Sequence, residues 1–174
     1  MEQLVMRWKK GLTPDAPDWG DTVCRRFDGS EKDVDAWLDI VADGLTDGKQ
    51  DAAFFQQCMY SHGKLEYDKF FMVECGGEPA ATLAVICDYE KREGYIHMVA
   101  CKSRFRGRGI GTRLCTEAVR ALIFAGMETA YLTTDDFRIP AIKSYLRAGF
   151  YPDIINGEHE RRWADVMDII GGKQ

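Results

Sequence analysis

The sequence predicts one domain over residues 1–174 with a mixed α/β (α+β) fold, in which helices flank a mostly antiparallel sheet. At 174 residues the chain is long enough for one substantial core. Phe70–Cys75 and Ala80–Cys87 are apolar runs joined at Gly76-Gly77, which predicts an antiparallel hairpin. Apolar residues at helical spacing precede and follow this hairpin, so neither a pure βαβ series nor an all-β barrel fits the order of elements.

Two strands and two helices are expected before the hairpin. Thr13–Asp21 is rich in Pro, Asp and Gly, which predicts a loop between the two strands. Ser30-Glu31-Lys32-Asp33 has the pattern of a capping box and predicts the start of the first helix. In chain order, we expect strands over 5–8 and 23–27 and helices over 34–45 and 51–60.

Strands and helices alternate after the hairpin. A charged turn over 88–94 leads to an apolar run, and Gly126 and Gly149 are placed to end the two helices that follow. Pro140 suits the first turn of the second of these helices. In chain order, we expect a strand over 95–101, a helix over 114–125, a strand over 131–134 and a helix over 140–149. The spacing of Trp163, Val166, Met167 and Ile170 favours a last short helix and leaves a strand open.

The composition limits the classes of function. The net charge is −5, which argues against nucleic-acid or anionic-membrane partners. The six cysteines form no C-x-x-C pair and the three histidines no H-x-x-x-H pair, so we expect neither disulfides nor a metal site. The N-terminus has no apolar signal core and no run approaches membrane-spanning length. We therefore expect a reduced, cytoplasmic protein. A local basic run contrasts with the acidic whole and consists of Lys102, Arg104, Arg106, Arg108 and Arg113.

Arg106-Gly107-Arg108-Gly109-Ile110-Gly111 lies between a predicted strand and a predicted helix. Glycines let the backbone approach a ligand closely, and a helix N-terminus offers unpaired N–H groups and a positive dipole end. This order therefore predicts a phosphate or pyrophosphate cradle. A dinucleotide fingerprint is excluded because Thr112 stands in place of the third glycine. A P-loop is excluded because Gly111-Thr112-Arg113 is no Gly-Lys-Ser/Thr ending. An ordinary tight turn with solvated arginines is the alternative.

Two motifs in order carry a resemblance to a known family. Arg106, Gly109 and Gly111 form R-x-x-G-x-G, and residues 141–150 match A-x-x-x-Y-x-x-x-G-F. Together they resemble the GNAT (GCN5-related) N-acetyltransferase superfamily. This resemblance implies acetyl-CoA as co-substrate and a sheet whose splayed strand pair receives it. The family often carries Asn three residues before the Ala, where this chain has Arg138, so the asparagine contact is not carried over.

The resemblance also implies which residues bind the cofactor. Loop amides are expected to hold the CoA pyrophosphate, and the free edge of the strand before the loop is expected to pair with pantetheine. Arg138 is expected to reach a phosphate. The residues implied are Val99, Cys101, Arg106, Gly107, Arg108, Gly109, Ile110, Gly111, Thr112 and Arg138. Val99 and Cys101 are equally compatible with plain core positions.

Tyr145 and His97 are the catalytic candidates. In the family the Tyr matching Tyr145 points at the CoA sulfur, which suits a general acid; the alternative is a packed Tyr bonded to a backbone carbonyl. Strand alternation places Tyr95, His97, Val99 and Cys101 on one face. The Glu base of histone-type members is absent near Tyr95. His97 is a reasonable replacement because imidazole titrates near neutrality, while a hydrogen-bonded core histidine is equally compatible. Glu93 and ordered water are further options for the base.

The acceptor is expected to be a small-molecule or peptide amine. In the family, acceptor specificity comes from the first two helices and their loop, here 33–64, and from the C-terminal tail. Carboxylates at Asp43, Asp47, Asp51 and Glu66 suit a cationic acceptor, although solvated surface is the commoner fate of such groups. The leading hypothesis is an acetyl-CoA-dependent N-acetyltransferase, with a homodimer possible. A non-catalytic acyl-CoA-binding or sensing module and a nucleic-acid-binding protein are the alternatives.

Overall fold

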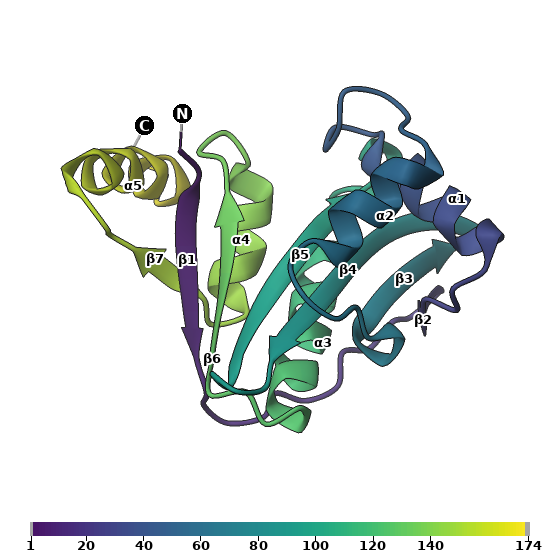
Figure 1. Ribbon diagram of the computed structural model, residues 1–174. Coiled ribbons are helices and arrows are strands. Elements are labelled where there is room, and N and C mark those ends of the chain that lie inside the picture. The colour runs from purple at the N-terminus through teal and green to yellow at the C-terminus, as the bar shows by residue number, and fades with distance from the viewer. Residues whose placement is uncertain (1, 173–174) are drawn as a thin grey trace.

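The protein is a seven-stranded sheet with helices on both faces, described for residues 2–172 by a computed structural model (Figure 1). The strands are β1 (Leu4–Lys9), β2 (Thr22–Arg26), β3 (Phe70–Cys75), β4 (Glu78–Asp88), β5 (Glu93–Cys101), β6 (Thr129–Thr134) and β7 (Tyr151–Asp153). The α-helices are α1 (Glu31–Val41), α2 (Ala52–Tyr60), α3 (Ile110–Phe124), α4 (Ile139–Arg147) and α5 (Gly157–Ile170). Short 3₁₀ turns cover Tyr67–Lys69 and Ser103–Phe105.

The sheet order is β2-β3-β4-β5-β6-β1-β7, and the strands pair antiparallel except at one place. That exception is the β5–β6 pair, which is parallel and joins only Glu93–Tyr95 to Thr129–Tyr131. Beyond these three residues the two strands separate, and Figure 1 shows them as the arms of a V. The mostly antiparallel sheet and the splayed strand pair are therefore confirmed.

Two apolar cores cover the two faces of the sheet. The larger combines residues of β1, β3–β6 with α3, α4 and α5, and includes Leu83, Leu114 and Trp163. The smaller packs α1 and α2 on the opposite face, around Trp37, Phe55 and Phe70. Helical spacing of the apolar side chains produces these buried faces. Within residues 2–172 no helix combines the length and apolar character needed to cross a membrane.

The predicted elements are present, with shifts at their ends. The first helix ends at Val41, four residues before the expected Leu45, so a longer loop connects it to α2. The helix after the glycines begins at Ile110 rather than at Leu114. The last segment is a helix, not a strand. β7 lies outside the predicted set, because three residues containing a proline carry no strand pattern on their own.

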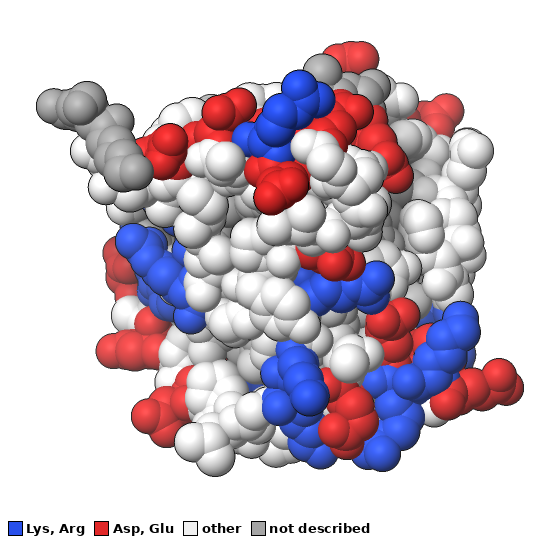
Figure 2. All heavy atoms as spheres, turned by 90° about the vertical axis from the view of Figure 1, so that its left-hand side faces the viewer, with Lys and Arg blue, Asp and Glu red and all other residues white. Residues whose placement is uncertain are grey.

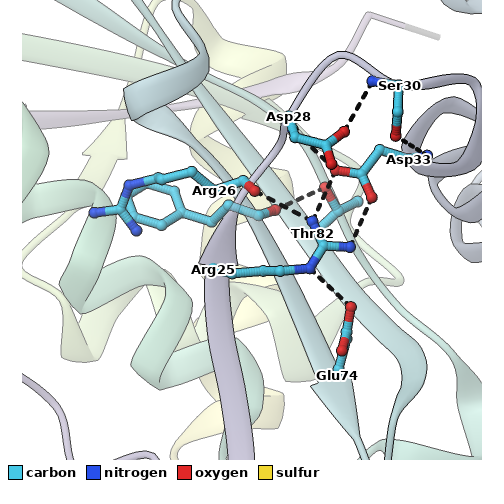
Figure 3. A network of polar contacts seen from close by, with 8 residues as sticks. Arg25, Arg26, Asp28, Ser30, Asp33, Glu74 and Thr82 are labelled. Carbon is cyan, nitrogen blue, oxygen red and sulfur yellow. Dashed lines mark hydrogen bonds and ion pairs between the residues drawn. The ribbon is translucent and has the colours of Figure 1, made fainter.

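An ion-pair network fixes α1 to the edge of the sheet (Figure 3). Arg25 on β2 donates to both carboxylate oxygens of Asp33, at 2.7 and 2.6 Å, and to Glu74 on β3 at 2.8 Å. Asp33 is 1% exposed and also accepts the Asp28 N–H at 2.9 Å. The bidentate geometry and the extra N–H satisfy a carboxylate that burial would otherwise destabilise. These contacts raise the pKa of Arg25 through its hydrogen bond to Asp33.

We expect Asp33→Ala to lower the free energy of unfolding by about 2–3 kcal/mol, because it removes the bidentate partner of a partly buried guanidinium and leaves the Asp28 N–H without its acceptor. The value is below that of a fully buried pair because Arg25 retains some exposure. Urea unfolding checks this. Asp35→Ala, on the exposed face of the same helix, is the control and should change stability by less than about 0.5 kcal/mol. Equal losses in both variants would contradict the role given to the network.

Candidate active site

The glycine-rich turn makes a backbone cradle between β5 and α3. Gly107 and Gly109 have φ of +77° and +73°, in the left-handed region that glycine tolerates best. Gly111 is close to α4, where an added Cβ would lie 3.3 Å from the Ser144 Oγ. The side chain of Ile110 is buried in the larger core. At its glycines and at Ile110 this turn therefore offers a ligand its backbone.

The N-terminus of α3 has free N–H groups. Its first helical bond runs from the Arg113 N–H to the Gly109 carbonyl at 3.1 Å, and no side chain of the described residues caps the preceding amides. By contrast, Ser30, Asp51 and Asn156 cap α1, α2 and α5. Unpaired N–H groups at the positive end of a 15-residue helix form an anion site.

The separation of β5 and β6 exposes a strand edge beside this cradle. Among residues 2–172, β4 is the only strand that pairs with β5 from His97 to Cys101. Successive residues of a strand direct their N–H and C=O groups to opposite sides. Some backbone groups of β5 therefore point into the gap, where an extended ligand can pair with them as a further strand would.

A β-bulge at Met98 changes which side chains share a face. Met98 has φ of +51°, and the β4–β5 register shifts there, with Ala84 opposite His97 and Thr82 opposite Ala100. Before the bulge, His97 lies on the α1/α2 face opposite Ala84, which belongs to the smaller core. After it, Val99 and Cys101 pack against the larger core on the α3/α4 face.

The expectation that Tyr95, His97, Val99 and Cys101 share one face is therefore wrong. Side chains alternate between the two faces of the sheet both before and after the bulge. The extra residue shifts this alternation, so the residues after Met98 point to the face opposite to the one expected. The side chains of Tyr95 and His97 lie on one face of the sheet, and those of Val99 and Cys101 lie on the other.

Tyr145 lies on α4 with its side chain in the larger core, 5% exposed. Burial raises its pKa above the ordinary value, and Cys115, Arg138 and Tyr95 are close enough to influence it electrostatically. The hydroxyl makes no hydrogen bond to any residue in 2–172, so the predicted alternative of a Tyr fixed to a backbone carbonyl is not observed. The phenol is held neutral with its donor uncommitted.

His97 is buried beneath α2. Its Nε2 is 3.2 Å from the Cys58 carbonyl oxygen and 3.6 Å from the Cys58 Sγ. Burial lowers its pKa to about 4, so the imidazole is neutral at physiological pH. Donation from Nε2 to the carbonyl leaves the Nδ1 lone pair as the position that accepts a proton.

Three aromatic side chains lie close together beside His97, near the vertex of the V. The rings of Tyr95 and Tyr131 stack with centroids 4.8 Å apart, where β5 and β6 make their last pairing. The ring of His62 is 4.8 Å from His97 and 5.1 Å from Tyr95. Tyr95, Tyr131 and His62 line a surface depression of about 470 Å³. His62 was missed by sequence reasoning because a histidine in a loop has no periodic pattern that would place it near β5.

Other charged candidates have structural partners. Glu93, an optional base, pairs with Arg7 at 3.1 Å. Three of the carboxylates considered for the acceptor are hydrogen-bonded within the fold: Asp43 to Ser103, Asp51 to the first turn of α2, and Glu66 to Tyr89. Asp47 is exposed.

The basic run is largely engaged within the fold. Lys102 and Arg104 pair with Glu78, and Arg113 donates to the carbonyls of Asp18 and Trp19. The Arg106 and Arg138 side chains bind the loop between α1 and α2, and the Thr112 hydroxyl donates to Ser144. Arg108 lies over the Phe105 ring without an ion pair among residues 2–172. The side of the molecule shown in Figure 2 likewise intersperses acidic and basic groups and has no continuous basic track.

The profile described as the acetyltransferase (GNAT) family matches residues 34–150, which include the cradle, the bulge and Tyr145. The chain belongs to the GNAT acetyltransferase family. The family match covers β5 and β6, all of α2 and α1 from residue 34 onward.

Relatives and solved structures agree with this assignment. An uncharacterized N-acetyltransferase of Methanocaldococcus jannaschii is 36% identical over 92 residues, which are 50% of this chain and 41% of the relative. N-alpha-acetyltransferase 30 of Xenopus laevis is 33% identical over 86 residues, 48% of this chain and 32% of the relative. The matched regions are thus less than half of each relative's length.

The fold is similar to that of solved GNAT structures. A GCN5-related N-acetyltransferase from Sphaerobacter thermophilus superposes with a TM-score of 0.70 at 19% identity, over 88% of this chain and 50% of that one. The ribosomal-protein-S18-alanine N-acetyltransferase from Escherichia coli superposes with a TM-score of 0.60 at 16% identity, over 76% and 79% of the two chains. These similarities concern the fold alone.

The buried neutral His97 predicts a pH dependence of stability. Its pKa is lower in the folded chain, about 4, than the ordinary 6.5, so the unfolded chain binds more protons between these values. Stability therefore falls as pH falls from about 6.5 to 4, by up to about 3 kcal/mol from this group. Urea unfolding at pH 7 and pH 5 should show a smaller loss in His97→Gln, which keeps a donor for Cys58. Identical losses in both proteins would contradict the assignment.

Proposed function

We propose that this chain is an acetyl-CoA-dependent N-acetyltransferase, acting as a single domain that moves the acetyl group from the thioester to a primary amine. The observation that carries the proposal is that an uncapped α3 N-terminus and an open β5 edge occur side by side in a member of the GNAT family. An anion cradle followed by a free strand edge suits a ligand that has a pyrophosphate at one part and an amide-containing arm at another.

The residues present fit the CoA ester. The N–H groups from Arg108 to Gly111 hold the pyrophosphate, and the backbone of Val99 and Cys101 faces the pantetheine arm. When bound, the ester supplies a thioester carbonyl for attack. A β5 amide directed at its oxygen stabilises the charge that develops there, because a preorganised dipole needs no reorganisation during the reaction. Val99 and Cys101 thus act through their backbone, while their side chains belong to the core.

Tyr145 gives a proton to the leaving thiolate. It packs on the cofactor side of the gap with an uncommitted hydroxyl, and burial keeps it neutral above the usual pKa of a phenol. A donor of such high pKa needs close positioning to act, and the helix α4 scaffold provides it.

The amine arrives from the other face, where Tyr95, Tyr131 and His62 line the depression. A lysine-like or α-amine must lose a proton before it attacks. His97 accepts that proton at Nδ1, directly or through water, and the ring of exposed His62 is 4.8 Å from the His97 ring. A base of such low pKa is weak, so an acceptor that is already partly deprotonated suits this site best.

Peptide α-amines are the first acceptors to test. N-alpha-acetyltransferase 30 and the ribosomal-protein-S18-alanine N-acetyltransferase are named for that class, and α-amines have lower pKa values than lysine side chains. A free small-molecule amine is the second class.

Cofactor binding is tested by thermal shift with acetyl-CoA and CoA. At about 100 times the dissociation constant, a ligand of the native state adds about 2.7 kcal/mol of stability. We expect this gain in the wild type and its loss in Gly109→Glu, which places a β-carbon at φ of +73° and a carboxylate in the cradle. Gly11→Glu, with open space around the residue, is the control and should keep the gain. Absence of stabilisation of the wild type would overturn the proposal.

Tyr145→Phe should lower kcat by about 100-fold and leave the dissociation constant of acetyl-CoA within about threefold, because the hydroxyl acts on the leaving group and not on binding. Turnover is measured with tetrapeptides bearing free N-termini. An unchanged kcat in Tyr145→Phe would remove Tyr145 from the mechanism. Binding without turnover of any amine would favour a non-catalytic acyl-CoA-binding module.

A further inference from the structure

The loop between α1 and α2, residues 42–51, lies above the end of the β5 arm, at the open end of the V (Figure 1). It has internal order of its own. Thr46 donates its N–H to the Val41 carbonyl and its hydroxyl to the Gly48 carbonyl, and Asp43 and Asp47 form a β-bridge. Leu45 packs against the smaller core. This α1–α2 loop is thus a folded segment whose position depends on how it is tethered.

The first tether comes from the β5 arm. Arg106 donates through Nη2 to the Asp43 carbonyl at 2.9 Å and through Nε to the Cys101 carbonyl at 3.0 Å. The Asp43 carboxylate accepts the N–H and the hydroxyl of Ser103, both at 2.8 Å. The loop is therefore fixed to the turn that leads from β5 into α3.

The second tether comes from the other arm. Arg138, at the N-cap position of α4, donates through Nη1 to the Gly44 carbonyl at 3.2 Å and through Nε to Asp135 at 2.9 Å. Asp135 follows directly after β6. The two arginines thus bind adjacent carbonyls of one loop from opposite sides of the gap. Gly44 has φ of +88°, and an added Cβ would lie 3.2 Å from the Arg106 Nη2, so this site suits glycine.

We propose that Arg138, together with Arg106, is a positioning residue that ties the α1–α2 loop across the gap between β5 and β6. This inference rests on the proposed function for its consequence: the tied loop is a wall of the space in which acceptor and thioester meet. Sequence reasoning placed both arginines among the cofactor-binding residues, Arg138 through a contact to a phosphate. The contacts assign their side chains to the loop, and the backbone of the glycine turn serves the anion.

Mutation can distinguish two roles of Arg138, a contact to the cofactor and a tether of the α1–α2 loop. A cofactor contact, when removed, weakens acetyl-CoA binding. A loop tether, when removed, frees the α1–α2 loop and weakens acceptor binding, while the backbone cradle still holds the anion. The charge of Arg138 is partly balanced by Asp135, which also favours the tether role.

The experiment compares wild type, Arg138→Met and Arg147→Met by hydrogen–deuterium exchange without ligand and by calorimetric titration with acetyl-CoA. Methionine keeps an unbranched side chain and removes the donors. Arg147 is the matched control because it is exposed on the same helix and has no ion pair among residues 2–172. In Arg138→Met we expect exchange within residues 42–51 to rise about tenfold, as for the loss of a charged hydrogen bond, with β6 and α4 unchanged.

We expect the dissociation constant of acetyl-CoA to change less than threefold in Arg138→Met. Unchanged exchange in 42–51, or a tenfold weaker acetyl-CoA complex with the loop still protected, would overturn the tether and restore Arg138 as a cofactor contact. Failure of the wild type to bind acetyl-CoA would reject the proposed function instead, while the exchange measurement still tests the tether.

A kinetic measurement adds a readout that a general loss of structure would not give. With the peptide acceptor that the wild type uses best, Arg138→Met should raise the KM for the acceptor about tenfold with kcat within twofold, and Arg138→Lys, which keeps one donor, should recover part of the loss. Parallel loss of kcat in both variants would contradict positioning of the acceptor wall.

Discussion

The early end of the β5–β6 pairing is the constraint on which the rest of the site depends. Three paired residues and the stacked rings of Tyr95 and Tyr131 close the vertex, and beyond them each strand is supported by a different neighbour, β4 on one side and β1 on the other. The gap between them is therefore set by the strand pairing. Its depth, its free edge and its two faces all follow from this single divergence.

The bulge at Met98 places different side chains of β5 on the two faces of the sheet. One extra residue in β5 directs His97 toward α2 and Val99 and Cys101 toward α3 and α4. Without the bulge, His97 would share a face of the sheet with Val99 and Cys101. A non-glycine residue with φ of +51° is strained, and its occurrence at the centre of the site agrees with the tendency of strain to gather where function needs it.

The backbone features of the site were predictable from the sequence, and most side-chain partners were not. Gly107 and Gly109, the hairpin at Gly76-Gly77 and the helix beginning near Pro140 have local signals, because a positive φ or a fixed φ selects the residue type. Met98 has no such signal, so strict alternation put His97 on the wrong side relative to Val99. The partners of Arg106 and Arg138 lie 63 and 94 residues away, and only the folded chain brings them together.

Cys101 has a further consequence for the chemistry. Its side chain packs against the larger core, next to the strand edge proposed for the cofactor arm, and a thiolate there would compete with the amine for the acetyl group. Burial raises the pKa of Cys101 to about 11, so the thiol stays protonated and poorly nucleophilic at neutral pH. The same protonated state protects it from oxidation. Burial of this thiol in the core therefore lowers its reactivity toward a thioester bound at the proposed site.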